Sequence, residues 1–443
     1  MPFSSSPLLT DLYQLTMAQS YIEHGLEEAA VFEFFVRRLP ACRNFLIAAG
    51  LEQVLEFLDN LGFSQEEVNW LESTGRFSRP LLDYLQDLRF TGDVEAVPEG
   101  TVFFPNEPIF RLVAPLPLAQ LVETRVINLL HFQTLVASKA ARLVLAAAGR
   151  MLVDFGLRRA HGFEAGLLAA RASYLVGFAG SSTVLAEREF GIPSYGTMAH
   201  SYIQACDDEA AAFENFLRSY PQGAMLLIDT YDTEAAAEKI VALMTRLKSS
   251  GTTLRAVRID SGDLAEHARK VRAILDRGGL QDVKIFASGN LDEYELHRLT
   301  LAHAPIDGFG VGTRMDTSSD APYLDCAYKL QEYAGKPRRK RSEGKATWPG
   351  RKQVCRRYNT QGQMCGDVLT LEDDRPDGRA LLRPVVRGGT RLVTCALEES
   401  RRYAQEEIAR LPVAMRSMQQ AVPYSVDVAP SVRALAAELD AKN

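Results

Sequence analysis

Cysteine is scarce in this 443-residue chain, and its few thiols are spaced like neither a disulfide framework nor a zinc site. The six cysteines include no Cys-x-x-Cys pair, and no histidine cluster lies near them. This pattern is typical of reduced thiols in the cytoplasm. The N-terminus also lacks a basic segment followed by an apolar core, which argues against a signal peptide. We therefore expect a cytoplasmic protein.

Long hydrophobic runs and an excess of one charge are missing as well. The most apolar stretch, residues 126–155, is interrupted by one histidine and three basic side chains, so it is too broken to span a bilayer. The 50 Lys and Arg nearly balance the 56 Asp and Glu, and the net charge is −6. Such a balance does not favour binding to nucleic acid or to membrane surfaces. We expect neither as a partner, so any anionic ligand must be held by local basic groups.

Basic residues do gather in one segment, residues 336–352, which holds eight Lys or Arg and one Glu and carries a local charge of +7. Its prolines and glycines predict a hairpin punctuated by turns. Most such runs are solvated faces, but a basic run beside a phosphate site could also guide polyanions. A nucleic-acid-binding protein built on an enzyme-derived scaffold remains a remote alternative.

Three common motifs are also absent. No Gly-x-Gly-x-x-Gly follows the first strand of the central region, which disfavours a dinucleotide-binding sheet. The absence of Gly-x4-Gly-Lys-Ser/Thr means that any ATP used here is not held by a P-loop. The absence of Gly-x-Ser-x-Gly removes the usual signature of acyl transfer.

What the sequence does contain is a regular alternation of strand-like runs and helical segments between residues 138 and 325. The strand-like runs recur at intervals of about 25 residues, the spacing of βα units in a parallel sheet. They are MLVDFG, SYLVGFAG, PSYGTMAH, AMLLIDTYD, LRAVRIDSGD, VKIFASGN and IDGFGVGT. Because polar residues follow each run, where barrels keep their sites, we predict an α/β fold built on an irregular TIM-like β/α barrel.

The flanking regions lack this rhythm. Residues 1–137 mix helical signals with short strand-like pieces and predict an N-terminal α+β domain. Residues 138–325 form the predicted catalytic barrel. Residues 326–443 are turn-rich, with one clear helical stretch, and we predict that this C-terminal segment packs back on the N-terminal domain.

Polar groups at the predicted strand ends should converge on one barrel mouth. They are Asp154, Arg158, Ser181, Ser182, His200, Asp229, Arg258, Asp260, Asp263, Ser288 to Asn290 and Gly310 to Thr313. A single Asp in such a place is more often a cap for the next helix than a catalyst. Seven strand ends that point the same way shift the balance toward a functional site.

Arg258 and Asp260 lie two residues apart, so on an extended chain both side chains emerge on the same face. The Arg258 guanidinium could grip a carboxylate in bidentate fashion, and Asp260 or Asp263 could hold ribose hydroxyls or a magnesium ion. The structural alternative is an ion pair with a helix cap, and the segment alone leaves both open.

The remaining candidates have equally plain alternatives. The Gly-rich turns 288–290 and 308–313 could bring backbone N–H groups against phosphate oxygens, or serve as ordinary turns. His200 could act as a base or as a nucleophile toward a phosphoryl group, although a lone histidine is usually structural. Tyr13 and Phe155 could grip a flat ring, although core packing is the commoner role of such aromatics.

Eleven segments that occur in order between about Thr10 and Arg357 resemble the nicotinate phosphoribosyltransferase family, a group of type II phosphoribosyltransferases. The segments are TDLYQLTMAQSY, FEFFVRRLP, AVPEGTVFFPNEP, NLLHFQTLVASKAAR, DFGLRRAHG, GTMAHSY, LIDTYDT, VRIDSGDL, FASGNLDE, GFGVGT and SEGKATWPGRKQV. So many independent motifs in one order make the resemblance specific.

The resemblance implies the transfer of phosphoribose from phosphoribosyl pyrophosphate (PRPP) to nicotinate, which yields nicotinate mononucleotide and pyrophosphate for NAD salvage. It implies ATP as co-substrate, with Mg²⁺ bound through the PRPP and ATP phosphates rather than by a clear set of protein side chains. It further implies a homodimer with shared active sites, in which the N-terminal domain contributes to the partner's site.

The resemblance also assigns roles to individual residues. His200, Asp229 and Asp260 are implied to be catalytic, with His200 phosphorylated by ATP. The implied substrate-binding residues are Tyr13, Phe155, Arg158, Ser182, Arg258, Ser288, Gly289, Gly312 and Thr313. Among these, Tyr13 and Phe155 sandwich the pyridine ring, and the guanidinium groups hold the nicotinate carboxylate or a nearby phosphate. Gly289, Gly312 and Thr313 bind the nucleotide phosphate.

Three pyridines are possible substrates for this chemistry: nicotinate, nicotinamide and quinolinate. Relatives that use nicotinamide carry an Asp in the segment that matches GSST, where this chain has Ser181 and Ser182. A carboxylate facing nicotinate would repel it, so serine favours the acid over the amide. A nicotinamide or quinolinate phosphoribosyltransferase remains the alternative.

Overall fold

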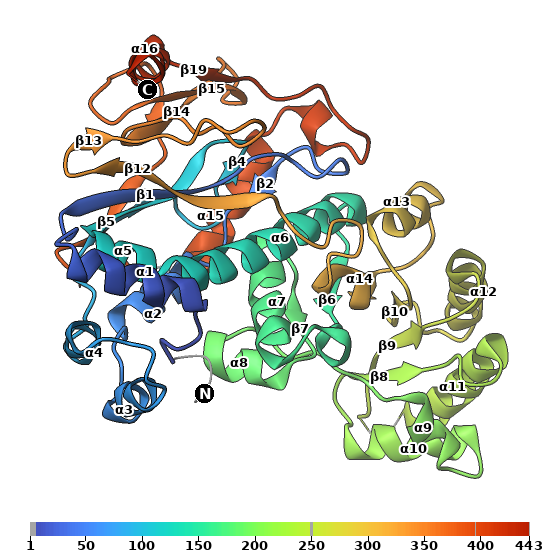
Figure 1. Ribbon diagram of the computed structural model, residues 1–443. Coiled ribbons are helices and arrows are strands. Elements are labelled where there is room, and N and C mark those ends of the chain that lie inside the picture. Colours follow the sequence, from blue (N-terminus) through green and yellow to red (C-terminus); the bar gives the residue numbers. More distant parts are fainter. Residues whose placement is uncertain (1–5, 249–250, 395, 443) are drawn as a thin grey trace. The chain divides into compact units, whose positions relative to one another are not determined.

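The structure is a computed structural model that describes residues 6–248, 251–394 and 396–442. The chain forms two compact units (Figure 1). The first unit combines Met1–Ser138 with Ala321–Asn443, and the second is Lys139–Asp320. The two ends of the chain therefore belong to one unit, and the central third of the sequence forms the other.

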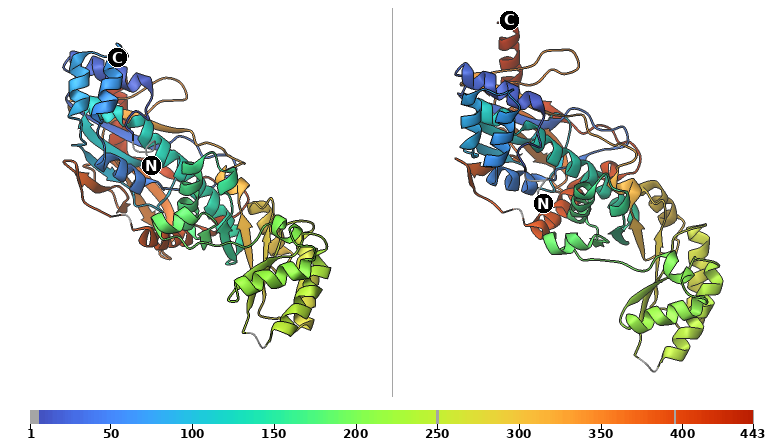
Figure 2. Two further views of the ribbon diagram at one scale, coloured as in Figure 1. Left: turned by 90° about the horizontal axis from the view of Figure 1, so that it is seen from below. Right: turned by 60° about the horizontal axis from the view of Figure 1, so that its bottom comes forward.

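The first unit is built on a seven-stranded antiparallel sheet that interleaves N-terminal and C-terminal strands. In sheet order the strands are β13 (Lys336–Pro337), β12 (Cys326–Tyr333), β1 (Ala29–Val36), β5 (Pro108–Pro115), β3 (Asp93–Ala96), β17 (Arg383–Arg387) and β18 (Thr390–Arg391). Strand β1 is apolar and almost wholly buried because it lies between two neighbours, with Phe34 opposite both Tyr328 and Phe110. The blue and orange segments accordingly run side by side in Figures 1 and 2. The predicted return of the C-terminal segment onto the N-terminal domain is confirmed.

Two smaller sheets and several helices complete this unit. The sheets are β2 (Leu46–Ile47) with β4 (Val102–Phe103), and β16 (Arg379–Ala380), β14 (Lys352–Tyr358), β15 (Met364–Leu371) and β19 (Val426–Val428) in that order. The helices are α1 (Leu12–Glu23), α2 (Leu51–Asp59), α3 (Gln65–Ser73), α4 (Arg79–Gln86), α5 (Leu116–Leu121), α6 (Glu123–Ala147, which ends in the second unit), α15 (Leu397–Arg410), η3 (Val413–Arg416) and α16 (Pro430–Ala441). Helix α3 begins with a capping box between Ser64 and Glu67.

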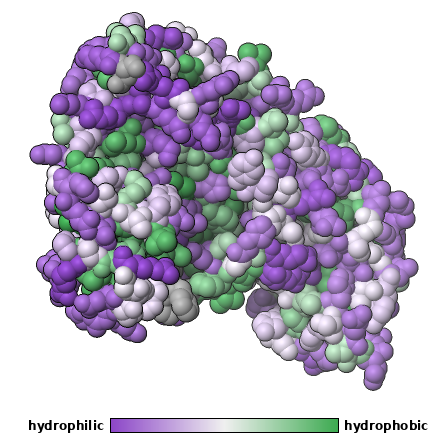
Figure 3. Space-filling model, viewed as in Figure 1, coloured by the Kyte–Doolittle hydropathy of each residue, from purple (hydrophilic) through white to green (hydrophobic). Residues whose placement is uncertain are grey.

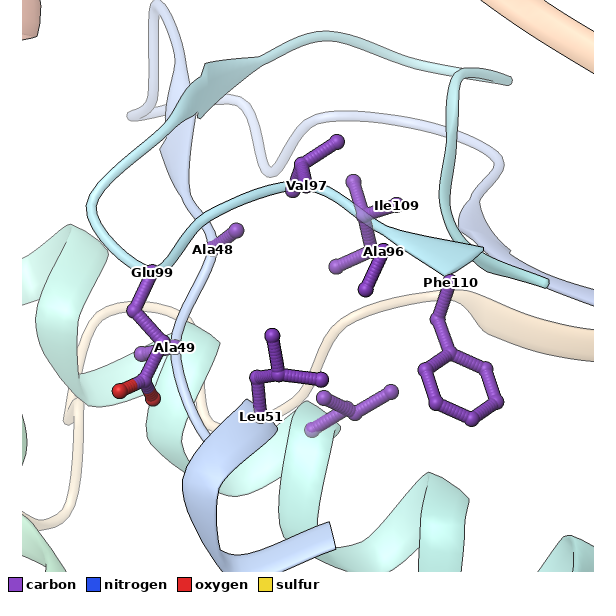
Figure 4. Close-up of a pocket in the computed structure, with 9 residues that line it drawn as sticks. Ala48, Ala49, Leu51, Ala96, Val97, Glu99, Ile109 and Phe110 are labelled. Carbon is purple, nitrogen blue, oxygen red and sulfur yellow. The ribbon is translucent and has the colours of Figure 1, made fainter. Parts of the chain in front are cut away.

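A small apolar cavity of about 10 Å³ lies in the first unit between the start of α2 and strands β3 and β5 (Figure 4). The labelled alanine, valine, leucine and phenylalanine side chains surround it, and the Glu99 carboxylate turns aside to accept a 2.6 Å hydrogen bond from the Gly50 N–H. A space of that size holds about one water molecule, so it is a packing defect rather than a substrate site.

The basic segment 336–352 turns back on itself, as its sequence predicts, with the Thr347 N–H donating to the Lys340 carbonyl at 3.0 Å, but it does not form two paired strands. Only Lys336 and Pro337 are strand, paired with the end of β12, and regular structure resumes at Lys352. Several of its charges are paired instead of solvated: Arg339 contacts Asp440 at 3.0 Å, and the buried Lys352 contacts Glu33 at 2.8 Å. The prolines and glycines interrupt the ladder too often for two strands to form.

The second unit contains a parallel sheet in which β6 lies beside β11, so strands that are distant in sequence are neighbours in the sheet. In sheet order the strands are β7 (Gly180–Ser181), β6 (Met151–Asp154), β11 (Gly308–Val311), β10 (Lys284–Ser288), β9 (Leu254–Ile259) and β8 (Ala224–Leu227). The helices are η1 (Leu157–Arg159), α7 (Phe163–Val176), α8 (Val184–Phe190), α9 (His200–Gln204), α10 (Glu209–Ser219), α11 (Thr233–Leu247), α12 (Leu264–Arg277), α13 (Glu293–Leu301) and α14 (Thr313–Asp316). The predicted α/β class is confirmed, with the barrel present as an open half-barrel in the described residues.

Local sequence explains how strands give way to helices here. Helices α10, α11, α12 and α13 each begin after an aspartate whose carboxylate accepts backbone N–H groups of the first turn, namely Asp208, Asp232, Asp263 and Asp292. Helix α12 then packs against β9 and β10, as Figure 1 shows. Because α11, α12 and α13 follow β8, β9 and β10 directly, the sheet presents the carboxyl ends of these strands at the turns that lead into the three helices.

Two of the seven predicted strands are wrong. Half of SYLVGFAG lies in helix α7, which ends at Val176 before Gly177 with φ +132°, and of this run only Gly180 is strand, followed by Ser181. PSYGTMAH makes a single bridge, between Ser194 and Ser181, before α9 begins at His200. Its aromatic and β-branched residues are typical of strands, but Pro193 and Gly196 break the run and no neighbouring strand extends the pairing.

Polar side chains cover most of the face seen in Figure 3. Across the described ranges, no helix is both long and apolar enough to cross a membrane.

Candidate active site

Strands β8, β9 and β10 end in a connected set of charged and hydroxyl side chains. Arg258 Nη1 donates to Ser288 Oγ at 3.2 Å and lies 3.4 Å from Asp260 Oδ1. The Asp260 backbone N–H donates to Asp229 Oδ2 at 2.9 Å. Ser261 Oγ donates to the same Asp229 oxygen at 2.5 Å. The parallel sheet thus brings together residues from three successive βα units, as predicted from their places in the sequence.

His200 joins this group through two contacts. Its Nδ1 lies 3.1 Å from Oγ1 of Thr230, the residue that follows Asp229. The segment just before it is held by Arg258, whose Nη2 donates to the Met198 carbonyl at 2.9 Å. The imidazole of residue 200 and the guanidinium of residue 258 therefore belong to one cluster at the carboxyl edge of the sheet.

Two polar atoms of this cluster are buried and have no partner among the described residues. They are Arg258 Nε and Asp229 Oδ1. Burial lowers the pKa of the Arg258 guanidinium, Asp260 and Asp229 raise it, and the nearby Arg158 lowers it further. A buried donor and a buried acceptor left free at a strand edge are costly in a finished core, so they indicate a place for a polar ligand.

The carboxyl end of β6 carries the aromatic candidate. Phe155 is half-buried, and its ring lies so close over Gly310 that a Cβ there would come within 2.3 Å of Phe155 Cδ2. Its centroid is 6.1 Å from that of Phe286. Glycine at position 310 on β11 thus leaves the space that this ring occupies.

The buried Asp154 carboxylate fixes the segments on either side of that ring. Its Oδ2 accepts a 2.6 Å hydrogen bond from Ser181 Oγ, and its Oδ1 accepts a 2.8 Å bond from the Gly156 N–H. Ser182, whose N–H donates to the Asp154 carbonyl at 2.8 Å, is exposed at the end of β7. The predicted candidates Phe155 and Ser182 therefore flank one buried carboxylate.

The Gly-rich turns lie at the ends of β10 and β11. Gly289 has φ +95°, and a Cβ there would lie 2.1 Å from the Asp260 carbonyl oxygen, so a side chain is excluded. A Cβ on Gly312 would lie 2.8 Å from the Phe155 carbonyl oxygen. Thr313 begins α14 and accepts a 2.6 Å hydrogen bond from Arg159 Nε. These close backbone approaches join the two turns to the strand ends beside them.

A cavity of about 640 Å³ opens beside these turns. It is lined by Asp260, Ser261, Gly262, Leu264, Gly289, Asn290, Asp292, Tyr294, Glu295, Arg298 and Arg314. Its size falls in the range of small-molecule sites. Because two predicted site residues lie in its wall, the cavity adjoins the cluster described above.

Tyr13 is the one predicted site residue that belongs to the first unit. It lies on α1 with 48% of its surface exposed. Partial burial raises the pKa of its phenol, with Glu123 and Asp11 adding to the effect. The exposed Tyr13 side chain is available to a ligand or a partner chain, and its role at a site stays a prediction.

Sequence reasoning missed several residues that build the cluster. Thr230 and Ser261 each stand next to a predicted aspartate, and a search for hydroxyls beside the strand-end carboxylates would have found both. Arg159 follows the predicted Arg158, and it is the former that contacts Thr313. Asp263, considered for ribose or magnesium, caps α12 through the N–H groups of Ala265 and Glu266.

Throughout the part of the chain that the structure describes, no three His, Cys, Asp or Glu side chains form a group that could hold a metal ion. The free Asp229 oxygen and the Asp260 carboxylate do suit Mg²⁺, which often binds one or two carboxylates together with substrate phosphates.

The chain is similar to known proteins over most of its length. Residues 8–131 match the family model for the nicotinate phosphoribosyltransferase (NAPRTase) N-terminal domain, and residues 151–342 match that for the nicotinate phosphoribosyltransferase (NAPRTase) family. Nicotinate phosphoribosyltransferase pncB2 of Mycobacterium tuberculosis is 50% identical over 428 residues, which cover 96% of this chain and 92% of the relative.

Solved structures show the same likeness in three dimensions. The crystal structure of human nicotinic acid phosphoribosyltransferase superposes with a TM-score of 0.86 at 29% identity, covering 97% of this chain and 99% of that one. The nicotinate-nucleotide pyrophosphorylase from Pyrococcus furiosus gives a TM-score of 0.75 at 25% identity, covering 92% and 96%. The chain therefore belongs to the nicotinate phosphoribosyltransferase family.

Proposed function

We propose that this protein couples ATP hydrolysis to the transfer of phosphoribose from PRPP to nicotinate, through a phosphorylated His200. The reaction yields nicotinate mononucleotide and pyrophosphate, and so salvages nicotinate for NAD synthesis in the cytoplasm. The observation that carries the proposal is the cluster in which His200, Asp229, Arg258 and Asp260 meet at one sheet edge. Membership of the family supports the pyridine and the sugar donor.

Nicotinate is a flat ring with one negative charge, and the second unit offers a partner for each feature. Phe155 supplies a ring face beside Gly310, and ring stacking contributes roughly 0.5 to 1.5 kcal/mol beyond area burial. Arg258, with Arg158 near it, supplies positive charge for the carboxylate or an adjacent phosphate. Ser182 adds a neutral hydroxyl where a carboxylate would repel the substrate.

The sugar phosphate needs different groups. Cleavage of the bond between ribose C1 and pyrophosphate builds positive charge on the ribose, which the carboxylates of Asp229 and Asp260 would stabilise. The backbone at Ser288, Gly289, Gly312 and Thr313 offers N–H groups for the 5′-phosphate. Mg²⁺, held by the phosphates with help from the two carboxylates, would neutralise the leaving pyrophosphate.

The orientation of His200 favours one of its nitrogens as the nucleophile. Nδ1 contacts Thr230 Oγ1, so an Nδ1–H that donates there leaves the Nε2 lone pair free. Attack of Nε2 on the γ-phosphorus of ATP forms a P–N bond and breaks the P–O bond to ADP. Water later attacks the same phosphorus, breaks the P–N bond and releases phosphate, which restores the imidazole and pulls a near-balanced transfer toward product.

Two copies of the chain would complete the site. Tyr13 is exposed in the first unit, whereas the ring face of Phe155 belongs to the second. We propose a homodimer in which Tyr13 of one copy covers the pyridine bound by Phe155 of the other.

The substrate assignment is tested by offering nicotinate, nicotinamide and quinolinate separately with PRPP, Mg²⁺ and ATP, and measuring mononucleotide formation. We expect product from nicotinate, with ATP raising the yield, and little from the amide or the diacid. Turnover of nicotinamide at an equal rate would contradict the role given to Ser182. Turnover of quinolinate with no response to ATP would favour the quinolinate alternative.

A further inference from the structure

Two buried carboxyl groups meet at Gly156, the residue after Phe155, and among the described residues no basic side chain pairs with either. Asp154 at the end of β6 is 0% exposed, and Asp316 at the end of α14 is 1% exposed. Both groups approach Gly156, whose N–H donates to Asp154 Oδ1 at 2.8 Å and where a Cβ would lie 2.2 Å from either Asp316 oxygen. Neither oxygen of Asp316 accepts a bond from any donor group in the described ranges. Two carboxyl groups buried this close together without a cation cannot both be ionised at low cost, so one of them carries a proton.

The Asp154 carboxylate already accepts two other hydrogen bonds. Its oxygens receive the Ser181 hydroxyl and the Gly156 N–H, so they act as acceptors. Asp316 has no such donors, which makes it the carboxyl group that carries the proton. Burial, followed by the charge and hydrogen bond of Asp154, raises the pKa of Asp316 well above its ordinary value.

The absence of a side chain at Gly156 makes room for this pair. A Cβ on Gly156 would lie 2.1 Å from Asp316 Cγ, so glycine at this position lets the carboxyl group pack against the backbone. The two segments are neighbours because β6 and β11 pair with Asp154 opposite Val311, and Phe155 N–H donates to the Val311 carbonyl at 2.8 Å. The contact therefore depends on strands that are distant in sequence.

We propose that Asp316 is a positioning residue that shares one proton with Asp154 and thereby fastens the turn after β11 to the loop after β6. That loop carries Phe155, and the turn carries Gly312 and Thr313. This inference rests on the proposed function, in which Phe155 binds the pyridine and Gly312 and Thr313 bind the phosphate. The shared proton then links the pyridine pocket to the phosphate pocket. Loss of the proton would place two negative charges in buried contact beside an anionic substrate.

Other charged groups near α14 have partners or act elsewhere. Helix α14 packs against η1 and α7, and the charged residues of these three elements are Arg158, Arg159, Glu164, Arg171 and Arg314. Arg159 donates to Thr313 Oγ1, and Arg314 pairs with Asp292. Asp154 is the one charged group that shifts the pKa of Asp316. The proton therefore belongs to the two carboxyl groups alone.

The test compares wild type with Asp316→Asn across pH, because an amide can donate to Asp154 without titrating. The pKa of Asp316 in the folded protein lies above its unfolded value of about 3.9. Its contribution to stability is therefore complete below that value and is lost as the pH rises toward the folded pKa. Between about pH 4.5 and 8.5, the midpoint of thermal unfolding of Asp316→Asn minus that of wild type should therefore rise with pH. Asp282→Asn, an exposed change in the same unit, controls for the loss of an aspartate and should show no such trend.

Two further measurements complete the test. Asp154→Asn removes the other half of the pair, and it should show the same trend if Asp316→Asn does not fold. At pH 7, Asp316→Ala should raise KM for nicotinate roughly tenfold with a smaller effect on kcat, the loss expected for one hydrogen bond to a charged group, and Asp316→Asn should restore it.

A difference in unfolding midpoint that stays flat with pH would overturn the shared proton. A difference that falls with pH would also overturn it, because an ionised pair holding a cation has the opposite sign. The unfolding measurements need no substrate, so they remain decisive even if nicotinate is not turned over.

Discussion

Replacing Arg258 with alanine should lower kcat/KM for nicotinate by roughly 10- to 100-fold, because a hydrogen bond to a charged group contributes about 1.5 to 3 kcal/mol and 1.4 kcal/mol corresponds to tenfold. The guanidinium has a second task, since it also ties the Met198 carbonyl and Ser288 into the cluster. Its loss should therefore disturb His200 as well as the binding of the carboxylate.

Two further variants serve as comparisons for Arg258→Ala. Tyr13→Phe keeps the aromatic ring and should cost less than Arg258→Ala. Arg255 lies on the same strand, but it is exposed and stacks on Tyr195 at 5.9 Å, so Arg255→Ala should leave kcat/KM near the wild-type value. Steady-state kinetics of the three variants, with unfolding curves to confirm that each is folded, measure the effect. Equal losses in Arg258→Ala and Tyr13→Phe would contradict the assignment.

Replacing Arg356 with methionine should destabilise the protein by about 3 to 5 kcal/mol, the usual cost of removing one partner from a buried ion pair. The Arg356 side chain is fully buried and lies between Asp367 and Glu407, with Nη2 to Oδ2 at 2.6 Å and Nη1 to Oε2 at 3.0 Å. Glu107 is also close, and burial followed by the charge of Asp367 raises its pKa well above the ordinary value. Without the guanidinium, the buried Asp367 carboxylate would lose its cationic partner, whereas Glu407 would keep Arg379 at 3.6 Å and Arg410 at 3.7 Å.

The neighbouring residue provides the control for that experiment. Arg357 pairs with Asp427 at 3.0 Å, but both side chains are largely exposed, and such pairs contribute about 0 to 1 kcal/mol. Arg357→Met should accordingly leave the midpoint of urea unfolding almost unchanged, whereas Arg356→Met should lower it. Similar midpoints for the two variants would show that the buried network does not hold the C-terminal segment in place.

The sequence predicts those parts of the structure that depend on local pattern. The spacing of apolar runs predicts a parallel sheet, and the polar residues that follow them predict where its carboxyl edge lies. Arg258 and Asp260 meet in space because side chains two residues apart on a strand share a face. Asp263 shows the limit of that reasoning, since the same residue type at a strand end becomes a helix cap.

The parts that sequence could not supply depend on contacts between distant segments. PSYGTMAH is composed like a strand, but whether it forms one depends on a neighbour with which to pair. Asp316 meets Asp154 only because β11 inserts between β6 and β10, and Arg356 finds its partners on β15 and α15. No local signal marks either residue as buried beside a carboxylate.

The most direct test of the proposed mechanism is to incubate the protein with ATP labelled at its terminal phosphate and search the chain for acid-labile, base-stable label. Wild type should acquire the label. So should His297→Ala, a change at an exposed histidine of α13 in the same unit. His200→Ala should acquire none and should lose the ATP stimulation of mononucleotide synthesis. Label that persists on His200→Ala would contradict the claim that this imidazole carries the phosphoryl group.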